Sequence, residues 1–152
     1  MTHDYIKPTG QLNITLIDAA GQIKFQTTVS NLIVTTGKVV AANRLIGNVS
    51  GDNAAMSHMG VGTDGGTILP LAASNTTLGS ALGTRQSVSS SVSDNVVTYS
   101  ATFGPDVATG AITEAGVFNA STSGKMLCRT TFPEINKEST DTLSINWNVT
   151  IN

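Results

Sequence analysis

The sequence predicts an all-β protein, an antiparallel β-sandwich of the jelly-roll or immunoglobulin-like kind with one short helix near residues 37–46. The clearest indication is the segment 141–152, where five apolar residues alternate strictly with polar ones. These five are Leu143, Ile145, Trp147, Val149 and Ile151. Alternation places them all on one face of a strand, whereas a helix would scatter them around its surface. Strand-like segments recur about every dozen residues with short polar links, which is typical of a sandwich.

We expect residues 1–10 to form an N-terminal arm and residues 11–152 to form a single domain. The arm has no hydrophobic periodicity. A length of 152 residues allows one domain with a substantial core but not two ample ones. Within residues 11–29, apolar and polar residues alternate on both sides of a turn at 18–21, which predicts a hairpin.

The only good helix candidate follows this hairpin. Thr35 or Thr36 can cap its N-terminus, and Gly47 marks its end. Val40, Leu45 and Ile46 give a partial apolar stripe, which is enough for the helix to lie on a sheet.

The middle of the chain predicts a short strand over 56–62, with Met59 and Val61 facing inward, followed by a long surface loop over 63–80. The loop has an apolar tip around Pro70. This tip either tucks under the loop or makes an intermolecular contact, and both alternatives stay open. The candidate contact residues are Ile68, Leu69 and Leu71 of the loop, with Tyr5 and Ile6 of the arm.

The second half of the chain reads as two hairpins and the final strand. Residues 85–103 predict a Ser-rich strand over 85–93, a turn at Asp94–Asn95 and a strand lined by apolar residues. Residues 111–119 and 125–132 predict the second hairpin. The sequence contains no internal repeat of fixed period.

No constellation of residues predicts a catalytic, cofactor or metal site. Residues 60–65 match G-x-G-x-x-G, but a dinucleotide site needs a helix there and an acidic residue about 20 positions on, near Arg85 here. His3 and His58 each lack a second ligand at the spacing of a zinc site. No G-x-S-x-G occurs. We therefore expect no enzyme.

Two residues in strand-like segments carry reactive groups. Glu114 lies among apolar residues, and we expect it to form a salt bridge or to face outward. Cys128 has no second cysteine to pair with, and we expect it to be a buried small apolar residue.

Charge and hydropathy exclude some partners. A net charge of −2, with eight Lys and Arg spread thinly, predicts no nucleic-acid binding. No apolar run approaches the roughly 18 residues of a membrane span, and the start does not resemble a signal peptide. Charged residues make up 12 %, against roughly 25 % in soluble domains, which suits a protein packed against neighbours.

Six pieces of the sequence, in order, give the chain a family resemblance: 29–38, 59–67, 77–79 with Arg85, 97–103, 110–119 and the alternating end 141–152. This series is similar to small structural proteins of tailed bacteriophages, which include head decoration, tail and fibre components. It extends from the first of these segments to the C-terminus. The resemblance implies a non-enzymatic virion protein. It assigns no catalytic or binding role to any residue of this chain.

The leading hypothesis is therefore a capsid decoration (cement) protein, synthesised in the bacterial host cytoplasm and localised in the virion. It would self-associate, as a trimer, and bind the major capsid protein or other virion proteins through the arm and the 63–80 loop. The alternative is a tail, baseplate or fibre module. A third hypothesis is a carbohydrate-binding β-sandwich for host attachment, although aromatics are only 5 % and Trp147 and Phe103 fall on inward faces.

Overall fold

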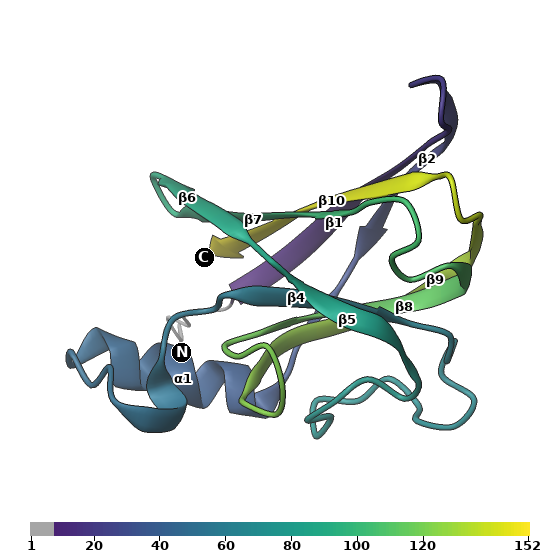
Figure 1. Cartoon of the computed structure of the whole chain (residues 1–152). Coiled ribbons are helices and arrows are strands. Elements are labelled where there is room, and N and C mark those ends of the chain that lie inside the picture. The colour runs from purple at the N-terminus through teal and green to yellow at the C-terminus, as the bar shows by residue number, and fades with distance from the viewer. Residues whose placement is uncertain (1–7) are drawn as a thin grey trace, which may run out of the picture.

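The computed structural model describes residues 8–152 and consists of two five-stranded antiparallel sheets packed face to face, which confirms the predicted β-sandwich (Figure 1). Sheet A has the order β2 (Ile23–Ser30), β1 (Pro8–Ile17), β10 (Thr142–Ile151), β7 (Val96–Phe103) and β6 (Ser89–Ser93). Sheet B has the order β3 (Leu32–Ile33), β9 (Met126–Lys137), β8 (Gly110–Phe118), β4 (His58–Gly62) and β5 (Ala81–Ser87). Helix α1 (Thr35–Leu45) and the short 3-10 turn η1 (Gly51–Asn53) complete the elements.

Strand β10 lies at the centre of sheet A, between β1 and β7. Its alternating apolar residues face sheet B, and Trp147 is fully buried between Leu12 and Tyr99 on the neighbouring strands. Only Ile151, at the end of the strand, is partly exposed. The buried ring anchors the core, as the alternation predicts.

The inner face of sheet B supplies the other half of the core. Met59 and Val61 of β4 point inward, as predicted, and Cys128 of β9 is buried among apolar residues. Burial raises the pKa of the Cys128 thiol, so it stays protonated. The prediction of a buried cysteine is confirmed.

Helix α1 packs on the end of the sandwich beside β9. The prediction that Thr35 or Thr36 caps it is wrong: the N-cap is Val34, with no side-chain cap. The Thr36 hydroxyl donates instead to the Met126 carbonyl at 2.9 Å, because the helix start lies against β9. Gly47, with φ of +76°, donates its N–H to a helix carbonyl and ends the helix as predicted.

The predicted single strand over 85–93 is divided in the structure. β5 pairs with β4 in sheet B, and β6 pairs with β7 in sheet A, so the chain crosses between the sheets at Val88. The Val88 N–H donates to the Ser57 carbonyl at 2.9 Å, which fixes the crossing. The sequence does not predict this division, because β6 follows β5 after a single residue and no turn residues separate the two strands.

The domain begins slightly earlier than expected. Strand β1 starts at Pro8 and its first three residues pair with Val149–Ile151, so residues 8–10 belong to sheet A rather than to the expected arm. The rest of the arm, including Tyr5 and Ile6, lies outside the described residues.

Candidate functional site

A cluster of charged side chains is buried on the outer face of sheet B. Arg129 of β9 and Glu114 of β8 have fully buried side chains, and Asp64 is 1 % exposed. Arg129 donates to Glu114 Oε2 from Nε at 3.0 Å and from Nη2 at 2.8 Å, and its Nη2 lies 3.6 Å from Asp64 Oδ2. The salt bridge expected for Glu114 is therefore confirmed.

Asp64 organises the start of the 63–80 loop. Its carboxylate accepts four backbone N–H groups at 2.8–3.1 Å, and these come from Gly66, Thr67, Ile68 and Leu69. These N–H donors, first that of Ile68, lower the pKa of Asp64 below its ordinary value. A negatively charged carboxylate thus fixes the backbone of this loop segment in one conformation.

Glu114 and Arg129 fix the rest of the loop. The Glu114 carboxylate accepts the N–H groups of Gly79 at 3.0 Å and Ser80 at 2.8 Å. Arg129 Nη1 donates to the Leu69 carbonyl and to Asn75 Oδ1, both at 2.9 Å. Both halves of an 18-residue segment without strands or helices are therefore held by the same three charged groups.

Two glycines leave room for these carboxylates. A Cβ at Gly62 would collide with the Glu114 carboxylate and the Ser80 carbonyl, and a Cβ at Gly79 would collide with the Asp64 carboxylate. Gly62 belongs to the G-x-G-x-x-G match, which lies on β4 and the loop and is followed by no helix. Position 62 needs a glycine because the backbone there comes too close to the buried Glu114 carboxylate to leave room for a side chain.

The anchored loop presents apolar side chains to solvent. Ile68 is 73 % exposed and Leu71 is 40 % exposed, whereas Leu69 is half-buried and its backbone is bonded to Asp64 and Arg129. Ile68 therefore does not tuck under the loop. Of the three candidate contact residues in the loop, Ile68 and Leu71 are available to a partner.

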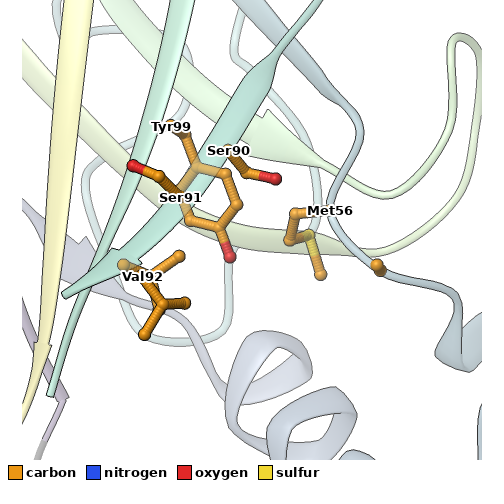
Figure 2. Close-up of a pocket in the computed structure, with 7 residues that line it drawn as sticks. Met56, Ser90, Ser91, Val92 and Tyr99 are labelled. Atoms are coloured by element: carbon orange, nitrogen blue, oxygen red, sulfur yellow. The ribbon is translucent and has the colours of Figure 1, made fainter. Parts of the chain in front are cut away.

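A second apolar region lies between helix α1 and the β6–β7 hairpin. A shallow hollow of about 250 Å³ lies there, lined by residues that include Met56, Val92 and Tyr99. Figure 2 shows the Tyr99 ring and Met56 facing the open space beside Val92. An adjoining hollow of about 200 Å³ shares Met56 and Tyr99 and reaches Arg44 on the helix. Burial raises the pKa of Tyr99 to about 12, so its hydroxyl stays protonated and uncharged.

Ser57 Oγ lies 2.8 Å from His58 Nδ1, but within residues 8–152 no carboxylate is hydrogen-bonded to this imidazole to complete a triad. No group of three His, Cys, Asp or Glu side chains in this part of the chain is arranged to hold a metal ion. The buried carboxylates are occupied by backbone N–H groups, Arg129 and Lys24.

Comparison of the chain with family models, curated proteins and solved structures found no match. Among the residues that the structure describes, no helix has the length and apolar character needed to cross a membrane. The geometry of the molecule is therefore the basis for a functional proposal.

Proposed function

We propose that this chain is a non-enzymatic structural protein of a tailed-phage virion, a decoration protein that binds the assembled head and stabilises it. One observation carries the proposal: the loop that exposes Ile68 is fixed from beneath by the buried Arg129–Glu114–Asp64 cluster. Binding through an irregular loop usually loses part of its favourable free energy, because a loop that is mobile in the free protein must be immobilised. Here the backbone is already immobilised.

A rigid loop with an apolar tip suits a binding surface better than an active site. Binding buries Ile68 and Leu71 without an ordering cost for their backbone, which favours attachment to a fixed surface such as an assembled shell. The proposed partner is the major capsid protein or another virion protein, and the bound copies would self-associate, as a trimer. Tyr5 and Ile6 of the N-terminal arm are proposed as further contacts.

The test measures binding of the purified protein to empty, assembled heads of the phage that encodes it, by co-sedimentation. The double variant Ile68→Ser/Leu71→Ser is expected to bind at least tenfold more weakly, because each buried aliphatic side chain contributes roughly 1.5–3 kcal/mol. Val92→Ser is the matched control, since Val92 is similarly exposed at 70 % but lies on β6 in the other sheet.

Unchanged binding of the double variant would contradict the role of the loop. The location is tested separately by gold-labelled antibodies on intact particles. Label spread over the head supports a decoration protein. Label confined to the tail or its tip overturns that assignment in favour of a tail, baseplate or fibre module, and no label on any particle contradicts a virion role.

A further inference from the structure

The two adjoining hollows beside Tyr99 form one shallow groove between helix α1 and the β6–β7 hairpin, which we call the Tyr99 groove. Apolar side chains from three segments line it: Val92 and Val97 from the hairpin, Met56 from the segment before β4, and Val40 from the helix. The groove is open to solvent beside Val92, which is 70 % exposed (Figure 2). An exposed apolar groove with a polar rim marks a contact site.

The size of the Tyr99 groove favours a segment of polypeptide over a small molecule. Its two parts have volumes of about 250 and 200 Å³. Each lies below the roughly 300–1,000 Å³ of most ligand pockets, which enclose the greater part of their ligand. An extended segment needs no such enclosure, because it places successive side chains along a groove.

Arg44 places a positive charge on the helix side of the groove. It is an exposed residue in the last turn of α1 and lines the smaller hollow. Within residues 8–152 its guanidinium forms no ion pair. The other two arginines are engaged, Arg85 by two backbone carbonyls and Arg129 by Glu114. An occupant that brings a carboxylate to Arg44 is therefore favoured over a purely apolar one.

Residues 1–7, which precede the described part of the chain, join the sandwich close to this groove. Pro8, the first residue of β1, lies at the end of sheet A that also carries the β6–β7 turn. Gly10 and Val97 both pair with Val149, so they lie in one row across three strands. With strands about 4.8 Å apart and about 3.4 Å per residue, Pro8 is roughly 12 Å from Val97.

The N-terminal residues have the length and the side chains that the groove requires. Tyr5 stands three residues before Pro8, a stretch that spans up to about 10 Å when extended, so its ring can enter the groove. Its neighbours are Ile6, a second apolar residue, and Asp4, the only acidic residue before Pro8. Two apolar side chains preceded by one carboxylate match an apolar groove that is bordered by Arg44.

We propose that residues 4–6 lie in the Tyr99 groove of their own chain. The Tyr5 ring covers Met56. The Asp4 carboxylate pairs with Arg44. Burial of the apolar side chains supplies most of the free energy, and the ion pair fixes the direction of the segment. The short covalent connection gives the segment an effective concentration on the order of millimolar, which favours it over the same segment of a second copy.

This inference does not rest on the proposed function, because it concerns the free chain. It adds a condition to that function, since the groove and the shell would compete for Tyr5 and Ile6. Attachment to a head would then release residues 4–6 from the groove, so these contacts stay covered until a partner is present.

Brief chymotrypsin digestion of the full chain, without phage heads, tests the docking. Chymotrypsin cleaves after Tyr5 only when this residue is accessible, and mass spectrometry detects the loss of residues 1–5. A peptide of residues 1–10 gives the cleavage rate of the undocked segment. We expect the full chain to be cleaved at this bond at least about tenfold more slowly than the peptide, because the Tyr5 ring is buried in the groove. Equal rates overturn the proposal.

Charge reversal at Arg44 separates docking in the groove from other causes of slow cleavage. Arg44→Glu is expected to accelerate cleavage after Tyr5 roughly two- to fivefold, the effect of losing an exposed ion pair. The charge swap Asp4→Arg/Arg44→Glu should restore the slow rate, measured relative to a peptide with the same change. Lys38→Glu is the matched control, since Lys38 is an exposed cation on α1 that lines neither hollow. Equal effects of Arg44→Glu and Lys38→Glu overturn the proposal.

The dependence of this protection on protein concentration identifies the occupant. Docking within one chain gives the same protection at about 1 μM and at about 100 μM, because the segment and the groove are covalently connected. Protection that increases with concentration overturns the proposal and assigns the groove to the N-terminal segment of a second copy.

Discussion

Two ion-pair clusters hold connecting segments of this protein, and they differ in their exposure to water. In the first, Arg129, Glu114 and Asp64 are at most 1 % exposed and fix the 63–80 loop. In the second, Lys24 of β2 bonds to Asp141 at 2.8 Å and to Glu138 at 3.3 Å in the β9–β10 turn. There Lys24 is 33 % and Glu138 is 66 % exposed, whereas Asp141 is 1 % exposed, so only part of this cluster is open to water.

The difference shows why the two clusters contribute differently to stability. Water and salt screen the Lys24 pairs, and Asp141 retains the Glu138 N–H as a partner when the lysine is lost. In the buried cluster water cannot replace a missing partner, so each group depends on the others. The burial of the cation, complete for Arg129 and partial for Lys24, rather than the number of ion pairs, separates the costs of breaking the two clusters.

The largest expected effect comes from Arg129→Met. Removing the guanidinium leaves the Glu114 carboxylate buried without its cation, which is expected to lower the free energy of unfolding by roughly 3–5 kcal/mol. Urea unfolding followed by Trp147 fluorescence measures this loss. The double variant Arg129→Met/Glu114→Gln should recover part of it, because glutamine still accepts a backbone N–H but carries no charge. A loss below about 1 kcal/mol for the single variant would show that the cluster is not needed.

An intermediate effect is expected from pH. The folded pKa of Asp64 lies below its ordinary value of 3.8, so the unfolded chain binds the proton more tightly. Its contribution to stability is therefore complete above that ordinary value and is lost as the pH falls through the lower folded pKa. Asp64→Asn should be less stable at pH 7 and lose less of its remaining stability between about pH 4 and pH 2. Parallel acid profiles of wild type and variant would contradict this linkage.

The smallest effect is expected from Lys24→Met. The hydrogen bond that Lys24 donates to the Asp141 carboxylate raises the pKa of Lys24, so the lysine is charged at neutral pH, but water reaches the partly exposed lysine and competes for this pair. We expect a decrease in Tm of roughly 1–3 °C in low salt. The decrease should nearly disappear in 1 M NaCl, where screening extends over only about 3 Å, whereas that of Arg129→Met should persist. Equal salt dependence in both variants would remove the distinction between the clusters.

The sequence predicts sheet A well because its strands are buried on one face only. In β10 and β1, apolar and polar residues therefore alternate along the sequence in the same way as their side chains alternate between the buried and the exposed face. β8 departs from this rule, since the loop covers its outer face and Glu114 is buried there with Val117 buried on the other side. Alternation cannot reveal a strand that is covered on both faces.

The candidate site is less predictable from the sequence. The loop and its apolar tip follow from local composition, and Asp64 before two glycines is a recognisable turn signal. Its connection to Arg129, 65 residues later, depends on sheet pairing that no local pattern encodes. Asn75 was missed for the same reason, since its partner is also Arg129.

The pairing of β1 with β10 has a consequence for synthesis in the cell. Residues 8–17 can complete sheet A only after residues 142–151 have been translated, because β10 lies between β1 and β7. Contacts this distant in sequence form slowly, and the β1–β2 hairpin must wait with its apolar face uncovered. A chain that stops before Thr142 lacks the strand that carries Trp147, so incomplete copies would fail to fold and would be excluded from any assembly.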